Sequence, residues 1–224
     1  MSQENKYHRY LNLPFEIRKP QICNVKPKDL KHYDIPNHKD DNITEFVKQF
    51  GLQIINTELF YTPGGKKLPI HIDDWEQDDH VKINISWGPK EGTTRWWNAP
   101  NFTEEEYDSN YNSSKDLNGE DYKNFSDRTH RSIILKEEEC ELVYEANTDK
   151  PSLVNVGTFH SSHNPTDEGR WTLCFILGYD KEYKEYLANF KEEKRRGRYV
   201  IMDNLVLWDK AIDIFKEFID GENF

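Results

Sequence analysis

The sequence predicts a mainly β protein with flanking helices, arranged as a β-barrel or sandwich. Segments with strand-like patterns follow one another at short spacing, separated by turn residues such as those at 63–65 and 148–151. The chain also carries 6 Trp, 12 Tyr and 12 Phe, which suit a packed aromatic core. A length of 224 residues fits one domain with a substantial interior.

Strand patterns and helix signals place the elements along the chain. A helix is expected over 43–50, capped by Asn42 and ended by Gly51, and an amphipathic helix is expected near the C-terminus, where apolar residues recur from Leu205 to Ile219. A short apolar stretch at 11–17 suggests an edge strand. The remaining strands are expected at 52–61, 68–73, 81–87, 94–97, 132–135, 141–145, 153–159 and 170–177.

These elements predict a single domain over 1–224. Residues 1–41 form a polar N-terminal arm, residues 42–180 a helix and the β core, and residues 181–224 a C-terminal helical segment. Within the core, residues 101–127 are rich in Asn, Ser, Asp and Tyr and lack periodicity. So long an excursion in a compact domain is usually functional, and we interpret it as a candidate lid.

Composition narrows the class of protein. A formal net charge of -11 argues against nucleic acid as a partner, and the basic run at 194–198 is interpreted as a solvated turn. Cys23, Cys140 and Cys174 are odd in number and widely spaced, so they indicate neither a disulfide scaffold nor a zinc motif, and we expect a reducing, cytoplasmic setting. No apolar signal region or membrane-spanning run is present, so no membrane partner is expected.

Three of the eight His residues are followed two positions later by Asp, and the pair His71 and Asp73 stands out because it follows an apolar segment. Alternate strand residues point to one side, so both can reach one metal ion. Two imidazoles and one carboxylate on one face of Fe(II) leave the other positions open for substrate and O2. His160 is the favoured third ligand. His163 is its rival, but it leaves only seven residues to Arg170, which is short for a turn between two barrel strands.

Arg170 lies ten residues after His160, in the segment Asn155-Val-Gly-Thr-Phe-His160-Ser-Ser-His-Asn164-Pro-Thr-Asp-Glu-Gly-Arg170-Trp-Thr-Leu. Its planar guanidinium suits two-point binding of a carboxylate. With an HxD pair, a later His and an Arg about ten residues beyond it in that order, the chain resembles the Fe(II)/2-oxoglutarate-dependent dioxygenase superfamily, especially its prolyl-hydroxylase-like and aspartyl/asparaginyl-hydroxylase-like members.

The resemblance covers about residues 50 to 180 and implies a double-stranded β-helix (jelly-roll, cupin-like) core. It implies that His71, Asp73 and His160 are the iron ligands and that Arg170 anchors 2-oxoglutarate. Tyr61, ten residues before His71, falls where some members place a Tyr that also binds 2-oxoglutarate. Asn84, in the strand after the HxD pair, matches an Asn that is seen in hydroxylase-like relatives.

The activity implied is hydroxylation of an amino-acid side chain of a peptide or protein, or of a small molecule, with O2 consumed and succinate and CO2 released. Asp73 disfavours halogenation, which generally requires the carboxylate ligand to be absent. Two alternatives from other classes stay open: a non-oxidative cupin-like metalloprotein, and a jelly-roll carbohydrate-binding module in which aromatic residues stack on sugars. The sequence identifies neither the substrate nor the oligomeric state.

Overall fold

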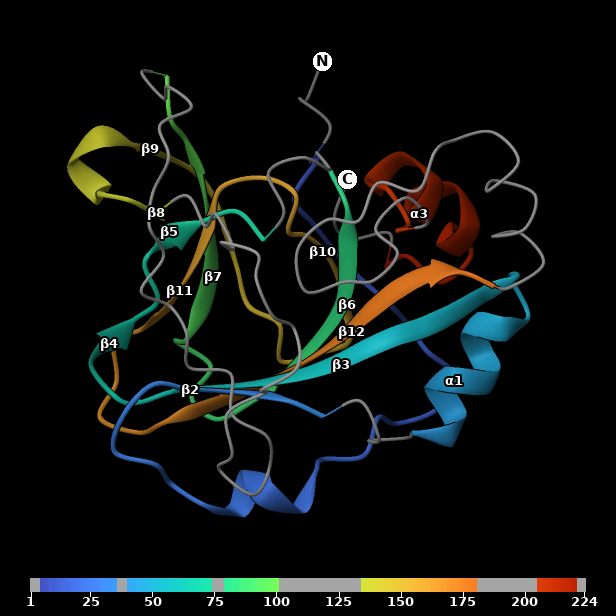
Figure 1. The fold of residues 1–224 in the computed structure, drawn as a ribbon, viewed down its shortest axis with the longest axis horizontal. Helices are drawn as coiled ribbons and strands as arrows, with labels where there is room; N and C mark the ends of the chain where they lie inside the picture. Colours follow the sequence, from blue (N-terminus) through green and yellow to red (C-terminus); the bar gives the residue numbers. More distant parts are fainter. Residues whose placement is uncertain (1–4, 36–39, 74–78, 101–133, 181–204, 221–224) are drawn as a thin grey trace, which may run out of the picture.

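The computed structural model describes residues 5–35, 40–73, 79–100, 134–180 and 205–220. Two antiparallel sheets form a sandwich (Figure 1). The large sheet has, in order, β1 (His8–Tyr10), β10 (Ser152–Asn155), β6 (Val81–Trp87), β12 (Arg170–Tyr179), β3 (Leu52–Thr62) and β2 (Lys31–Asp34). The small sheet has β8 (Ile134–Leu135), β5 (Ile70–His71), β11 (His160–Asn164), β7 (Thr93–Asn98) and β9 (Glu141–Ala146), with β4 (Lys66–Lys67) also paired to β11.

The strand order is that of a jelly roll. Eight strands make up the core: β3, β5, β6, β7, β9, β10, β11 and β12. When these are numbered 1 to 8 along the chain, they lie side by side in the order 6-3-8-1 in the large sheet and 2-7-4-5 in the small sheet. First and last strands therefore lie side by side, as do the second and the seventh, which winds the chain into a double-stranded β-helix. The predicted fold class, mainly β with this core, is confirmed.

Two helices, α1 (Asp41–Lys48) and α3 (Trp208–Phe215), pack against the large sheet on the side away from the small sheet (Figure 1). Alternate residues of β12, such as Leu173 and Phe175, join Phe46 of α1 and Phe215 of α3 in the main apolar cluster. The intervening residues of the same strand face the small sheet. The large sheet therefore has an apolar outer face and a more polar inner face. Among the described residues, no helix is long and apolar enough to cross a membrane.

Several predicted boundaries differ from the structure. Helix α1 is capped by Asp40, not Asn42, because the Asp40 carboxylate accepts hydrogen bonds from the backbone N–H groups of Asn42 and Ile43 at 3.1 and 3.3 Å. Gly51 follows the helix with φ 68°, as expected for a helix stop. The edge strand expected at 11–17 is wrong: the strand is β1, and Leu11 forms an isolated bridge to Ile219.

The second half of the core contains one strand that the sequence patterns did not predict. The strand expected at 153–159 ends at Asn155, and β11 begins at His160. Its sequence, His-Ser-Ser-His-Asn, lacks the apolar alternation by which strands are recognised. The excursion at 101–127 lies outside the described residues, as does most of the segment expected to be helical at 181–224, apart from 205–220.

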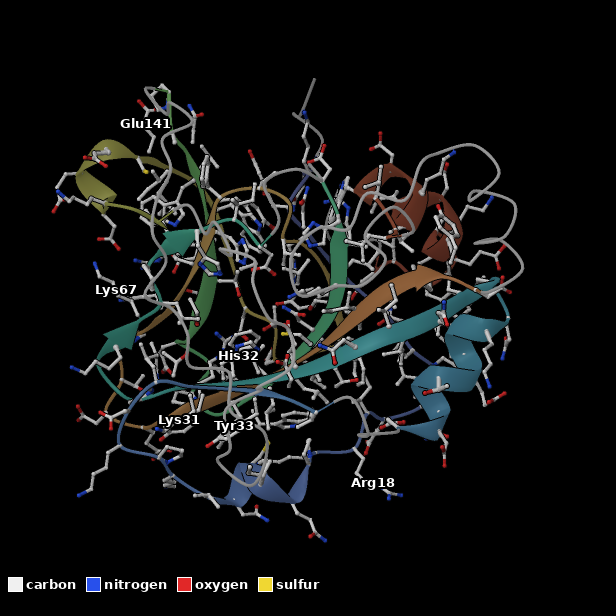
Figure 2. The ribbon with its side chains drawn as sticks, viewed as in Figure 1. Arg18, Lys31, His32, Tyr33, Lys67 and Glu141 are labelled. Carbon is white, nitrogen blue, oxygen red and sulfur yellow. The ribbon has the colours of Figure 1, made fainter. Side chains whose placement is uncertain are left out.

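The predicted N-terminal arm contributes β1 and β2, which form the two edges of the large sheet. On β2, Tyr33 stacks on Trp171 with ring centroids 6.2 Å apart, over the outer face. Figure 2 shows that His32 extends from β2 in the opposite direction to Lys31 and Tyr33. His32 therefore faces the space between the two sheets.

Candidate metal centre

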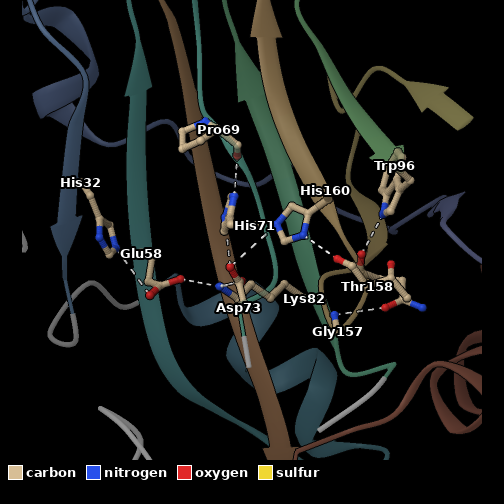
Figure 3. Close-up of polar contacts among 11 residues, drawn as sticks. His32, Glu58, Pro69, His71, Asp73, Lys82, Trp96, Gly157, Thr158 and His160 are labelled. Atoms are coloured by element: carbon tan, nitrogen blue, oxygen red, sulfur yellow. Dashed lines mark hydrogen bonds and ion pairs between the residues drawn. The ribbon is translucent and has the colours of Figure 1, made fainter. Parts of the chain in front are cut away.

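Register in the small sheet brings two predicted ligands together. His71 on β5 is the direct antiparallel partner of His160 on β11, and their ring centroids are 4.4 Å apart. Asp73 follows His71 by two positions and returns to the same side (Figure 3). One ligand atom from each of the three residues lies within 4.8 Å of the others. Strand pairing thus brings His71 and His160 together although they are about ninety residues apart in the sequence.

Backbone carbonyl groups hold both imidazoles in one orientation. The Nδ1 atom of His71 lies 2.9 Å from the carbonyl oxygen of Pro69, and that of His160 lies 2.9 Å from the carbonyl oxygen of Thr158. Because a carbonyl oxygen only accepts, Nδ1 carries the hydrogen in both rings. A neutral ring then presents the lone pair of Nε2, which is the form in which His binds metals.

Both Nε2 atoms are directed at one oxygen of Asp73. The distances to Asp73 Oδ1 are 3.3 Å from His71 and 3.7 Å from His160. The other oxygen, Oδ2, lies 2.6 Å from Nζ of Lys82, which in turn lies 2.6 Å from Oε2 of Glu58 (Figure 3). Asp73 therefore offers Oδ1 to a metal ion while Lys82 neutralises and orients the rest of the carboxylate.

Electrostatics keep the three groups in distinct protonation states. Burial raises the pKa of Asp73, but Lys82 and a hydrogen bond from His71 hold it well below its usual range, so the carboxylate is ionised. Burial and then the neighbouring His71 lower the pKa of His160 to about 3. Burial also lowers the pKa of His71, yet the hydrogen bond and charge of Asp73 outweigh it and the pKa ends raised. The region between these atoms attracts a cation, and a proton on His71 is the simplest one.

A cavity between the two sheets opens onto this centre. Beside the three candidate ligands and Lys82, its lining is a mixture of apolar side chains with hydroxyl and amide groups: Phe60, Thr62, Leu68, Asn84, Thr94, Val154, Val156, Ser161, Ser162, Thr172 and Cys174. Asn84, a predicted co-substrate residue, is thus one of the residues that line the cavity. Its Oδ1 atom is buried and has no hydrogen-bond partner among the described residues. A buried unpaired acceptor of this kind is available to a bound molecule.

Arg170 lies at the start of β12, on the same face as the cavity residues Thr172 and Cys174. It is 1% exposed, and burial lowers its pKa to about 10. The structure gives its guanidinium one hydrogen bond, 2.8 Å to the hydroxyl of Thr148, and no carboxylate of the described residues pairs with it. A Cβ atom at Gly92 would lie 2.6 Å from its Cδ, so glycine makes room for the side chain. Arg170 itself is not among the residues that line the cavity.

Two other predicted residues are not brought to the centre. Tyr61 lies between Phe60 and Thr62 on β3 and therefore points to the outer face, where its ring is 4.8 Å from that of Trp171. The expectation that Tyr61 contacts a co-substrate in the cavity is therefore wrong. His163, the rival third ligand, is three positions beyond His160 and does not join the cluster, which leaves His160 in that place.

Sequence reasoning missed Lys82 and Glu58, which are 3% and 1% exposed. A signal was present, since each is a charged residue within an otherwise strand-like segment, at 81–87 and 52–61. Charged residues are almost never fully buried unless they are paired. Two such residues on strands of one sheet were therefore candidates for a buried ion pair.

The sequence matches no family model and no curated protein. Among solved structures, the chain is similar to HygX from Streptomyces hygroscopicus with nickel and 2-oxoglutarate bound, at 12% identity and a TM-score of 0.38, over 84% of this chain and 85% of that one. A nickel complex of the non-heme monooxygenase ThoJ gives 18% identity and a TM-score of 0.30, over 60% of this chain and 48% of that one. The match thus spans about half of the ThoJ chain.

An RmlC-like cupin protein from Desulfovibrio desulfuricans gives 9% identity and a TM-score of 0.31, over 71% of this chain and 97% of that one. These likenesses to cupin-fold proteins and non-heme oxygenases are distant. At such TM-scores they carry no weight in assigning fold or function, which rest on the strand order and side chains of this chain.

Proposed function

We propose that this chain is an Fe(II)- and 2-oxoglutarate-dependent oxygenase that hydroxylates an amino-acid side chain of a peptide or protein, or a small molecule. One observation carries the proposal: the Nε2 atoms of His71 and His160 face the same oxygen of Asp73, and a hydrogen bond at Nδ1 orients each ring. Two imidazoles and one carboxylate on one side of a cavity are the donor set of non-haem Fe(II) oxygenases.

The three ligands and Lys82 would have different roles at this centre. Iron held by the three ligands would supply O2 activation, coupled to decarboxylation of 2-oxoglutarate to succinate and CO2. His71 and His160 would bind as neutral donors, and Asp73 would bind through Oδ1 while Lys82 holds Oδ2. Because the three ligands come from one side, the cavity side would be left to co-substrate and substrate.

Arg170 is proposed to bind the distal carboxylate of 2-oxoglutarate. A buried guanidinium has five donors, and the one partner of Arg170 among the described residues is a neutral hydroxyl, so it is costly to keep in the interior without an anion. A planar carboxylate would supply the missing charge and accept two hydrogen bonds at once. Asn84 is proposed to contact bound substrate or co-substrate through its unpaired Oδ1.

The test is an anaerobic titration with Fe(II) and 2-oxoglutarate, followed by the weak visible metal-to-ligand charge-transfer band. We expect the band in the wild type and loss of iron binding in His160→Ala. In Arg170→Ala we expect iron binding to persist and 2-oxoglutarate affinity to fall at least about 30-fold, the loss that follows when one partner of a buried charge pair is removed. Arg95→Ala is the matched control, because Arg95 pairs with Glu145 at a partly exposed site.

Iron binding without the band at any 2-oxoglutarate concentration would contradict the proposal and favour a non-oxidative cupin-like metalloprotein. Absence of metal binding in the wild type would leave the carbohydrate-binding module. A second readout, O2 uptake and succinate formation in the presence of candidate substrates, then separates an active oxygenase from a protein that merely binds the co-substrate.

A further inference from the structure

A second cluster of metal-ligating side chains lies on the inner face of the large sheet. His32 and Asp34 are alternate residues of β2, and Glu58 on β3 is the direct antiparallel partner of Asp34. His32 Nε2 lies 3.4 Å from Glu58 Oε1 and 3.8 Å from Asp34 Oδ1. One ligand atom from each residue lies within 4.8 Å of the others. His32 and Asp34 are one of the HxD pairs in the sequence that the first centre does not use.

Aromatic stacking fixes the plane of the His32 ring. Its centroid is 4.3 Å from that of Phe60, and the two planes differ by 4°. The Nε2 atom is buried and has no hydrogen-bond partner among the described residues. Figure 3 shows the ring directed at the carboxylate of Glu58. The nitrogen is thus held beside two carboxylates without a hydrogen bond to either, as expected of a donor that awaits a ligand.

The two carboxylates of this cluster repel one another. Asp34 and Glu58 are directly opposite on neighbouring strands, with side chains 11% and 2% exposed, and like charges in that relation destabilise a sheet. Lys82 bonds Oε2 of Glu58, while Oε1 faces His32. Asp34 Oδ1 accepts a hydrogen bond from the amide of Asn56 at 3.3 Å. A cation between Oε1 and Oδ1 would attract both carboxylates.

We propose that His32, Asp34 and Glu58 form a second metal site, for a transition-metal dication such as Zn²⁺ or Mn²⁺. The imidazole favours Zn²⁺ over Mg²⁺ or Ca²⁺, and the two carboxylates also suit Mn²⁺. Two ligands each about 2.1 Å from a tetrahedral ion are about 3.4 Å apart, so the 3.4 and 3.8 Å separations need little adjustment. An ion bound there joins β2 to β3 and so ties the N-terminal edge strand to the sheet.

The site is tested in the full-length chain with His71 and His160 both changed to Ala, which removes the first centre. Zn²⁺ stoichiometry and affinity are measured by competition with a chromogenic chelator, and Co²⁺ coordination by visible absorption. We expect two ions per wild-type chain and one per double variant. Adding His32→Phe or Asp34→Asn to the double variant should abolish that binding, whereas adding His163→Phe, a change of the same type outside both clusters, should leave it intact.

Thermal unfolding without metal shows that each variant folds, and Zn²⁺ should raise the Tm of the double variant but not of its Asp34→Asn derivative. Failure of the double variant to bind either ion overturns the proposal. Binding that survives both His32→Phe and Asp34→Asn, or that is lost equally in His163→Phe, also overturns it. The outcome is independent of the proposed oxygenase activity, because the background lacks His71 and His160.

Discussion

The two clusters share an arrangement of residues but have the reverse ratio of imidazoles to carboxylates. Each has an HxD pair and a third residue on a neighbouring strand, one in the small sheet and one in the large sheet. The first has two imidazoles and one carboxylate, and backbone carbonyls bond Nδ1 of both rings. The second has one imidazole and two carboxylates, and stacking on Phe60 orients the ring. A carbonyl fixes both the plane and the tautomer of a ring, whereas stacking fixes only its plane.

The two clusters therefore differ in how far their imidazoles are preorganised for a metal ion. At the first cluster the carbonyl contacts leave Nε2 of each neutral ring as the donor to a metal ion, whereas stacking at the second fixes no tautomer. They are also joined, because Lys82 on β6 bonds Asp73 of the first and Glu58 of the second, each at 2.6 Å. Glu58, Lys82 and Asp73 therefore form a row of alternating charges between His32 and His160 (Figure 3). The two clusters are distinct in donor set but share one cation.

Replacement of the shared cation is expected to have the largest effect. Lys82→Met removes the ammonium group that bonds both Asp73 and Glu58, and removal of one member of a buried ion pair costs about 3–5 kcal/mol of the free energy of unfolding. Urea unfolding in the presence of a chelator measures the loss. Lys67→Met is the control, since Lys67 pairs with Glu137 while 55% exposed and should cost at most about 1 kcal/mol. Part of the loss should be recovered in Lys82→Met/Glu58→Gln; equal losses in the two single variants would show that the row is not stabilising.

The same substitution in each of the two aspartates tests whether the two clusters bind metal independently. Asp73→Asn keeps the shape of the side chain but removes the anionic ligand, so Fe(II) affinity at the first centre should fall more than about 100-fold, or about 3 kcal/mol. Asp34→Asn, the same change in the other HxD pair, should leave that affinity within about threefold, because Asp34 does not contact the first centre. Anaerobic Fe(II) titration measures both. Comparable losses would mean that the clusters act as one unit through Lys82.

The order of residues in the sequence was enough to select the three residues that the structure brings together in the first cluster, because part of the geometry follows from local rules. Strand alternation places Asp73 beside His71, and ligand chemistry requires a further imidazole. Pairing of His71 with His160 was not visible, since β11 carries no apolar pattern. The face of β3 was also misjudged: Tyr61 was expected in the site, yet Phe60 and Thr62 line the cavity.

The second cluster could not be predicted, because it depends on the place of β2 in the sheet. Residues 31–34 look like part of a polar arm, and nothing local indicates that they pair with β3. Only that long-range pairing brings Asp34 opposite Glu58. Strand pairing is decided by the burial of both faces of a sheet, which is a property of the whole fold. The pairing of β2 with β3 thus makes His32 and Asp34, an HxD pair in the polar arm, part of a candidate site.

The smallest expected effect concerns the ring that orients His32. Phe60→Leu removes a stacked pair worth about 0.5–1.5 kcal/mol, so Zn²⁺ affinity at the second cluster should fall by up to about tenfold while Fe(II) affinity at the first stays unchanged. Tyr33→Leu is the matched control, because it removes an aromatic contact of β2 on the opposite face of the sheet. If both substitutions weaken Zn²⁺ binding equally, the ring acts only by docking β2 onto the sheet. A loss confined to Phe60→Leu assigns it the orientation of the imidazole.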